Sequence, residues 1–284
     1  QAHRHPDFIF QLRKPQITKT HMTGNIRYHR QFKSKYLQFK RDIIVYLPPS
    51  YLSSPLKRYP VLYMHDGNNL FDARTSFAGV PWAVNETVQS LIEQDKLNEI
   101  IVVGIYNTPA RLYEYTWRPM ELEENEIHGG LGKYYARFII EELKTFIDRH
   151  YRTLSDRENT AIMGSSLGGL INFYLACHYS DVFSKVALIS PSFWWGDGEP
   201  FKDVTKLPHN LKIWMDMGAL ESGSQKPEDI ELTLYFTRIM KKFLLGHGYQ
   251  ENKNFVYFED HKGYHDERSW GRRVHRPLLF FFGK

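Results

Sequence analysis

The sequence of 284 residues has little cysteine, since Cys177 is its only one. A single thiol excludes an internal disulfide but leaves the compartment open, because many secreted proteins have no disulfides. No apolar run reaches about 18 residues, so we expect no membrane-spanning helix. The chain begins with Gln1 and lacks an initial Met, so a cytoplasmic and a secreted location both remain open.

The sequence also lacks a large excess of positive or negative charge. Lys and Arg number 37 against 32 Asp and Glu, and both kinds are spread along the chain. Without a basic stripe or a nucleic-acid motif, we expect no nucleic-acid partner. There is no repeat, low-complexity tract or long linker. We therefore predict one domain over residues 1–284, with residues 1–22 as a polar N-terminal arm.

Short apolar runs alternate with helical patterns along the chain. The runs predict buried strands at residues 42–47, 61–64, 100–105, 161–163, 186–189, 211–215 and 254–258. Helical apolar faces are predicted within residues 139–147, 170–177 and 232–243, the last formed by Leu232, Phe236, Ile239 and Phe243. This alternation predicts an α/β fold with a mostly parallel central sheet and helices on both faces. Functional loops then belong at the carboxyl ends of the strands.

A G-x-S-x-G motif centred on Ser166 follows the predicted strand 161–163 and precedes the predicted helix. The motif alone is a weak signal, and a serine that only caps the helix is the alternative. The strand–turn–helix context is that of a nucleophile elbow, in which a strained turn exposes the serine hydroxyl above the sheet. We therefore predict Ser166 as a nucleophile at a helix N-terminus, where developing negative charge is favoured.

An oxyanion hole needs two backbone N–H donors. The N–H of Leu167, directly after the nucleophile, is one candidate. The second is expected in the loop that follows the predicted strand 61–64, from Gly67 or Asn68, and spacing does not decide between them. An ordinary Asp-Gly turn is the alternative for this loop.

Two histidines follow the last predicted strand. We favour His265 as the general base because it comes after Gly263 and opens the final segment, whereas His261 is close to the strand end. Their i, i+4 spacing is also that of a metal-binding pair on a helix, but Gly263 argues against a continuous helix there and no Glu follows the first His. We therefore predict no metal and no other cofactor.

The acid of a triad is expected between the nucleophile and the base in this fold. Asp216 and Glu221 both follow the predicted strand 211–215, and we favour Glu221 because it lies in the loop beyond Gly218. Asp216 stays the alternative, and a Ser–His dyad without an acid is also open.

Aromatic and basic residues after other strands are candidates for binding substrate. Trp194 and Trp195 follow the predicted strand 186–189. Two interpretations are open for them, stacking on an aromatic acyl group or a sugar, or a place in the core. Arg111 follows the strand 100–105, and for it the two interpretations are holding a carboxylate or catecholate oxygen, or a place on the surface.

Several motifs in order resemble the putative-esterase family of α/β hydrolases, which includes feruloyl, acetyl-xylan and trilactone siderophore esterases. The resemblance covers about residues 23–283 and rests on Val45–Pro49, Tyr59–Gly67, Tyr151–Thr153, Gly164–Leu170, Ser190–Trp195 and Gly263–Glu267. Asn68 stands where the family usually has Gln, and Trp117 where it usually has Pro. Both departures are expected near the mouth of the site, which makes Trp117 a further candidate for binding substrate.

The resemblance implies a carboxylic ester hydrolase that forms an acyl-enzyme with Ser166, His265 and Glu221. Feruloyl or acetyl carbohydrate esters, or another small acyl ester, are the expected substrates. The alternatives are a trilactone siderophore esterase and an acyltransferase similar to the mycolyltransferases. An inactive binding protein of the same fold is a third alternative. We expect a small-molecule or carbohydrate partner and no membrane, and the oligomeric state stays open.

Overall fold

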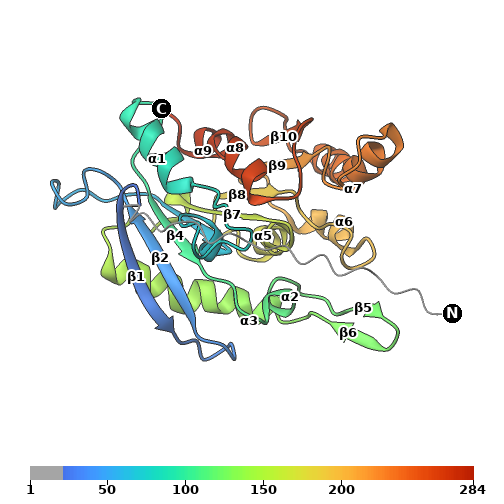
Figure 1. Cartoon of the computed structure of the whole chain (residues 1–284), viewed down its shortest axis with the longest axis horizontal. Coiled ribbons are helices and arrows are strands. Elements are labelled where there is room, and N and C mark those ends of the chain that lie inside the picture. The colour runs from blue at the N-terminus through green and yellow to red at the C-terminus, as the bar shows by residue number, and fades with distance from the viewer. Residues whose placement is uncertain (1–21) are drawn as a thin grey trace, which may run out of the picture.

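An eight-stranded sheet forms the centre of the computed structural model, which describes residues 22–284 (Figure 1). Its strands run in the order β1-β2-β4-β3-β7-β8-β9-β10. Strand β2 is antiparallel to β1 and to β4, and all other neighbours are parallel. The strands are β1 (Asn25–Phe32), β2 (Arg41–Leu47), β3 (Val61–His65), β4 (Ile101–Ile105), β7 (Thr160–Ser165), β8 (Lys185–Ile189), β9 (Lys212–Gly218) and β10 (Phe255–Asp260).

The predicted α/β class with a mostly parallel sheet is confirmed, and each predicted strand is present. Strand β1 was not predicted. It is an edge strand whose residues are all exposed or half-buried, so its sequence lacks the apolar run that marks a buried strand. The polar arm predicted for residues 1–22 lies outside the described residues, apart from its last residue.

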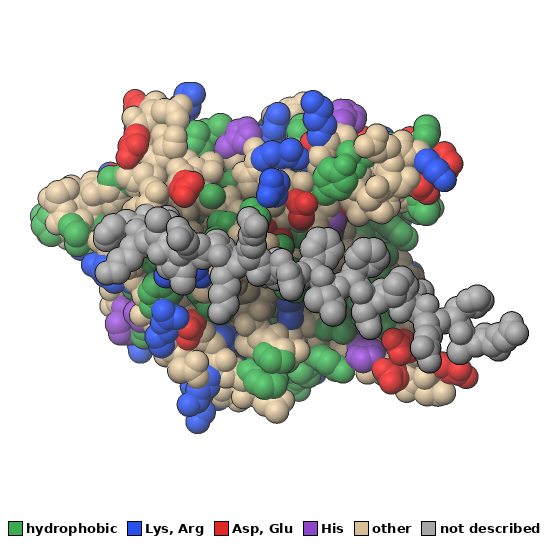
Figure 2. Space-filling view, viewed as in Figure 1, with side chains coloured by type: hydrophobic (Ala, Val, Ile, Leu, Met, Phe, Trp, Pro, Cys, Tyr) green, Lys and Arg blue, Asp and Glu red, His purple; other side chains and the backbone are tan. Residues whose placement is uncertain are grey.

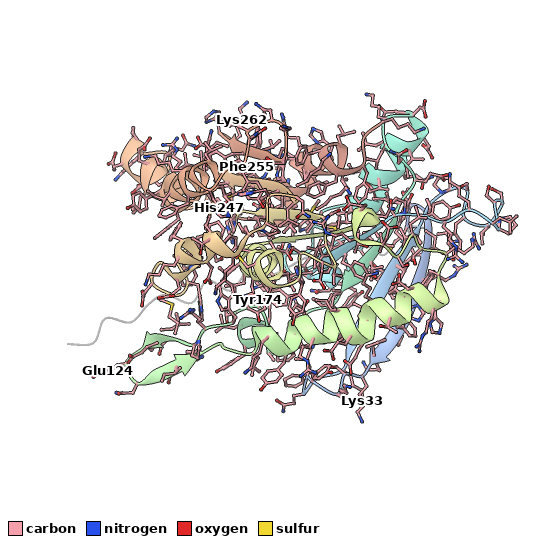
Figure 3. All side chains as sticks on the ribbon, turned by 180° about the vertical axis from the view of Figure 1, so that it is seen from behind. Lys33, Glu124, Tyr174, His247, Phe255 and Lys262 are labelled. Carbon is pink, nitrogen blue, oxygen red and sulfur yellow. The ribbon has the colours of Figure 1, made fainter. Side chains whose placement is uncertain are left out.

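Helices connect the strands and pack on the sheet. The α-helices are α1 (Val84–Glu93), α2 (Arg111–Glu114), α3 (Gly132–Arg137), α4 (Lys144–His150), α5 (Leu167–His178), α6 (Glu199–Asp203), α7 (Pro227–Gly246), α8 (Glu267–Arg273) and α9 (His275–Phe282). A π-helical segment, η2 (Phe138–Leu143), joins α3 to α4 into the long helix seen in Figure 3. Short 3-10 helices are η1 (Gly67–Asn69), η3 (Arg157–Asn159) and η4 (Val204–Lys206). A separate hairpin of β5 (Met120–Glu123) and β6 (Glu126–His128) projects from the body, with Glu124 at its tip (Figure 3).

Two apolar cores cover the two faces of the sheet. Along β2, Ile43 and Val45 face one core, while Ile44 and Tyr46 face the other, as the alternation of a strand requires. The first core includes buried side chains of α3, α4, α5 and α7, and the second includes those of α1, α8 and α9. The sheet is therefore covered on both faces, and its functional edge is left at the carboxyl ends of the parallel strands.

Helix α7 buries a different face from the one predicted. Its buried side chains are those of Leu234, Thr237, Met240 and Leu244, whereas Leu232 and Phe243 of the predicted stripe are exposed. Apolar residues occur on both sides of α7, so periodicity alone did not identify the buried side. Thr237 belongs to the buried side because its hydroxyl lies 3.0 Å from the hydroxyl of Tyr257 on β10.

Charged side chains of both signs are interspersed over the face that Figure 2 shows. Within residues 22–284, none of the helices is both long and apolar enough to span a bilayer.

Candidate active site

Ser166 occupies a sharp turn between β7 and α5. Its backbone has φ 60° and ψ −122°, a conformation that L-residues rarely adopt. A Cβ on Gly164 would come within 2.7 Å of the His65 ring and 2.9 Å of the Gly168 backbone. The first glycine of the motif therefore has a packing reason, which supports the strained turn that exposes the Ser166 hydroxyl.

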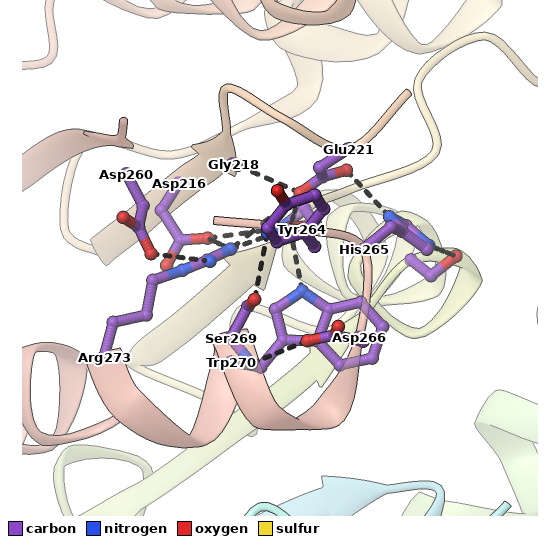
Figure 4. Close-up of polar contacts among 12 residues, drawn as sticks. Asp216, Gly218, Glu221, Asp260, Tyr264, His265, Asp266, Ser269, Trp270 and Arg273 are labelled. Carbon is purple, nitrogen blue, oxygen red and sulfur yellow. Dashed lines mark hydrogen bonds and ion pairs between the residues drawn. The ribbon is translucent and has the colours of Figure 1, made fainter. Parts of the chain in front are cut away.

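The predicted nucleophile, base and acid come together at the carboxyl end of the sheet. Nε2 of His265 lies 2.9 Å from Oγ of Ser166. On the other side of the ring, Nδ1 of His265 lies 2.7 Å from Oε2 of Glu221, a contact that Figure 4 marks between the two labelled residues. The three side chains come from the turn after β7 and the loops after β10 and β9. Glu221 is almost buried, while the His265 side chain is 39% exposed, so the ring can meet both a substrate and water.

The two rival residues lie elsewhere. Asp216 is fully buried, and its two carboxylate oxygens accept hydrogen bonds from Arg273 and Trp214, each at 2.8 Å. His261 is exposed on the loop after β10, and it is His265 whose ring nitrogen lies within hydrogen-bond distance of Ser166 Oγ. The geometry thus favours Glu221 over Asp216 and His265 over His261.

The candidate oxyanion loop after β3 forms η1. Gly67 is buried against β4, and a Cβ there would lie 2.6 Å from the Gly104 backbone. Asn68 instead lines a pocket together with Ser166. Leu167 is the first residue of α5, where backbone N–H groups have no partner within the helix. Placement at the pocket favours Asn68 over Gly67 as the second donor.

A pocket of about 620 Å³ opens beside Ser166 and His265. Arg111 lines it and forms a bidentate ion pair with Asp66, at 2.8 and 2.9 Å. Burial opposes ionisation of Asp66, but the guanidinium of Arg111 and a hydrogen bond from Asn107 together lower the pKa of this carboxyl. Arg111 therefore faces the pocket with its charge already paired, and within residues 22–284 its Nη1 group has no hydrogen-bond acceptor, which leaves donors for a substrate.

A second pocket, of about 270 Å³, lies on another side of His265. Trp194 lines it and is exposed, as expected for a residue that contacts substrate. Trp195 corrects the prediction, because its ring is buried and its indole N–H donates to the Arg118 carbonyl at 2.9 Å. Trp117 also corrects the prediction, because it lies away from the site. Its ring stacks on that of Tyr174, with the ring centroids 5.3 Å apart, and it lines neither pocket.

Sequence reasoning missed several polar residues of the site. Ser192 Oγ lies 3.3 Å from Ser166 Oγ, and Ser190 contacts Glu221. Ser190 directly follows β8 and Ser192 lies two residues further on, so the rule that applies to other strand ends would have found them. Glu267 lines the larger pocket, and its pKa is raised by burial and by the nearby Asp66 and Asp266. No comparable signal marks Arg273, which lies on a helix.

No group of three or more His, Cys, Asp or Glu side chains within the described part of the chain is arranged to hold a metal ion.

Together, the sheet order and the serine turn define an α/β hydrolase. Residues 34–281 match the family model described as "Putative esterase", and the chain belongs to that family. It is 27% identical to the uncharacterized protein YbbA of Bacillus subtilis over 248 residues, which cover 86% of this chain and 93% of YbbA. It is 31% identical to the ferri-bacillibactin esterase BesA of Bacillus subtilis over 162 residues, 52% of each chain. The BES protein from Bacillus cereus has a similar fold, with a TM-score of 0.70 at 19% identity, covering 95% of this chain and 99% of that one.

Proposed function

We propose that the described chain is a single-domain serine carboxylesterase with Ser166 as nucleophile, His265 as base and Glu221 as acid. The observation that carries this proposal is a pair of hydrogen bonds in series, at 2.9 and 2.7 Å, through the two nitrogens of one imidazole. The three groups come from three separate loops that the sheet brings together, which supports a catalytic arrangement over a local packing contact. Nucleophile, base and orienting acid have this order in serine hydrolases.

In the first half of the reaction, Oγ of Ser166 bonds to the ester carbonyl carbon while Nε2 of His265 takes the serine proton. Negative charge develops on the carbonyl oxygen, and the N–H groups of Leu167 and Asn68 are the proposed donors to it. The bond to the alkoxy oxygen then breaks, and His265 gives its proton to the leaving alcohol. Glu221 holds the imidazole in the required tautomer and stabilises the imidazolium.

In the second half, water attacks the acyl-enzyme and His265 takes its proton. The bond from Oγ of Ser166 to the acyl carbon breaks, and the serine recovers its proton from His265. Water rather than a second alcohol is the proposed acceptor because the His265 side chain is 39% exposed. An acyltransferase of the mycolyltransferase type must exclude water from this step. Supplying an aryl ester with glycerol and counting acid and ester products distinguishes the two.

Small acyl esters, including feruloyl and acetyl carbohydrate esters, are the proposed substrates. The exposed ring of Trp194 can stack on an aryl group or a sugar, and a ferulic acid esterase has a similar fold, with a TM-score of 0.67. A trilactone siderophore is the second candidate, supported by the similarity to a ferri-bacillibactin esterase. Rates on aryl acetates, methyl ferulate, acetylated xylan and a trilactone siderophore decide between them.

Mutation of the nucleophile and base tests the mechanism. Ser166→Ala and His265→Ala should each lower kcat by on the order of 10⁶ on the best substrate of the panel. His261→Ala is the matched control, an exposed histidine on the same loop, and should keep most of the activity. Near wild-type turnover by folded Ser166→Ala would overturn the proposal, and equal losses at both histidines would overturn the assignment of the base.

A further inference from the structure

Ser190 directly follows β8 and is buried behind the proposed acid. Its backbone has φ 43°, and its side chain points into a polar cluster between the sheet and α8. The hydroxyl contacts Oε1 of Glu221. It also accepts hydrogen bonds from Nη2 of Arg273 at 2.8 Å and from Nε1 of Trp270 at 3.0 Å.

These contacts fix the direction of the Ser190 proton. A hydroxyl has one proton to donate and two lone pairs. Both neighbouring nitrogens can only donate, because a guanidinium and an indole have no acceptor. They therefore occupy the lone pairs, and the single proton of Ser190 is left for Glu221.

The Ser190 hydroxyl helps to orient the carboxylate of Glu221. Oε1 of Glu221 accepts from the Ser190 hydroxyl and from the Gly218 N–H at 2.9 Å. The other oxygen, Oε2, is then the one that faces Nδ1 of His265. Two donors on one oxygen hold the carboxylate against rotation.

The donors to Ser190 are themselves held in place. Nη2 of Arg273 bridges Ser190 and Asp216, and Nη1 lies 3.4 Å from Asp260 (Figure 4). Burial opposes the charged form of Arg273, but the carboxylates of Asp216, Glu221 and Asp260 together outweigh this effect, and the pKa of Arg273 is raised. Trp270 and Arg273 are three residues apart on α8, which begins two residues after His265. One short helix thus supports both the base and the donors behind the acid.

We propose that Ser190 is a positioning residue for the triad acid, with its proton directed by Arg273 and Trp270. This inference rests on the proposed function, in which Glu221 orients the base. Ser190 does not reach the reacting atoms. It acts by holding Glu221, and through it His265, in one geometry throughout the reaction.

Ser190→Ala tests the proposal, with Ser184→Ala as the matched control. Both serines are buried, and they lie at opposite ends of the same strand. Ser190→Ala should lower kcat roughly 10- to 100-fold, the range for losing a hydrogen bond to a charged group, with KM nearly unchanged. Ser184→Ala should leave both constants close to wild type. Equal kcat in all three proteins would overturn the proposal.

The pH profile separates positioning from a loss of packing. Without the Ser190 proton, the negative charge of Glu221 is less stabilised and attracts a proton on His265 more strongly. The midpoint of the acidic limb of kcat/KM should therefore move to higher pH in Ser190→Ala. The other charged groups near His265 and Glu221 are unchanged in the variant: Asp66, Arg111, Asp216, Asp260, Asp266, Glu267 and Arg273. A fall in kcat with an unmoved midpoint would assign Ser190 to packing only.

A neutral replacement of the ion pair tests the direction of the proton. Arg273→Met combined with Asp216→Asn avoids leaving a buried charge unpaired at position 216 and removes one donor to Ser190. Its kcat should fall, and adding Ser190→Ala should lower it less than the same change does in the wild type, because the two act through one contact. Full additivity would contradict the proposed coupling. Failure of the proposed function would look different: activity would then survive in Ser166→Ala, whatever the variants at Ser190, Arg273 and Asp216 show.

Discussion

Two aspartate–arginine pairs flank the site, and they differ in what surrounds them. Asp216 and Arg273 lie behind the acid, with side chains 0% and 3% exposed. Asp66 and Arg111 lie beside the candidate oxyanion loop, with side chains 7% and 29% exposed. Both aspartates are at or near the carboxyl end of a parallel strand, β9 or β3.

The same pairing of charges therefore serves two different purposes. In the buried pair, Nη2 of Arg273 donates to side-chain oxygens of Ser190 and Asp216. We infer that this arginine holds other residues of the site in place. In the other pair, the guanidinium of Arg111 lines the pocket and can contact a substrate. Exposure of the arginine, rather than the ion pair itself, distinguishes a group that holds the site from one that meets a ligand.

The largest effect on stability is expected from breaking the buried pair. Asp216→Asn should lower the free energy of unfolding by roughly 3–5 kcal/mol, because it removes the charged partner that lies closest to the buried Arg273 guanidinium. Asp66→Asn should cost only about 1–2 kcal/mol, because the half-exposed Arg111 can then be hydrated. Urea denaturation measures both, and equal losses would remove the distinction between the pairs.

Acid should weaken the fold through His65, the residue next to Asp66. The His65 ring is buried between the Tyr135 hydroxyl and the Asn172 side chain, and this burial lowers its pKa to about 4. The unfolded chain binds a proton at this position below its ordinary pKa of 6.5, while the folded chain does not until about pH 4. Stability should therefore fall by up to about 3 kcal/mol as the pH drops through this window.

His65→Gln removes this titration while keeping polar atoms for both neighbours. Its stability, measured by urea denaturation at several pH values, should change less between pH 6.5 and 4 than that of the wild type. An unchanged slope would show that other groups account for the acid sensitivity.

The smallest effect is expected from a conservative change in the exposed pair. Arg111→Lys keeps a charge beside Asp66 but loses the planar fork, so KM should rise about 3- to 10-fold for esters that carry carboxylate or catecholate oxygens. Neutral acetyl esters should be little affected. Arg273→Lys is the comparison variant, and it should lower kcat for every ester without this selectivity. Steady-state rates on the ester panel measure both, and a loss that is uniform over the panel in Arg111→Lys would contradict a contact role.

Much of the fold could be predicted from the sequence because the parallel strands are buried on both faces and read as apolar runs. Strand β1 could not, since an edge strand of half-buried residues has no such run. The buried side of α7 was also not predictable, because the helix carries apolar residues on two sides and includes Thr237 in the buried one.

The site was predictable where local sequence determines its geometry. The turn at Ser166 follows from a strand, a glycine and a helix in succession. The choice between Asp216 and Glu221 was only a preference, because both follow the same strand. What separates them is Arg273, more than 50 residues further along the chain, which takes Asp216 as its partner. The sequence also did not distinguish Trp194 from Trp195, because both follow the same strand. In the structure Trp195 packs inward and Trp194 points outward.

Covalent labelling tests the central claim most directly. The reagent is an alkyl fluorophosphonate, from whose phosphorus an activated serine oxygen displaces fluoride. It is incubated with the wild-type protein and with His265→Ala, and the modified peptide is located by mass spectrometry. The account predicts rapid labelling of one site in the wild type, at Ser166, and much slower labelling of the variant. Labelling of another residue, or equal rates in the two proteins, would contradict a nucleophile at Ser166 activated by His265.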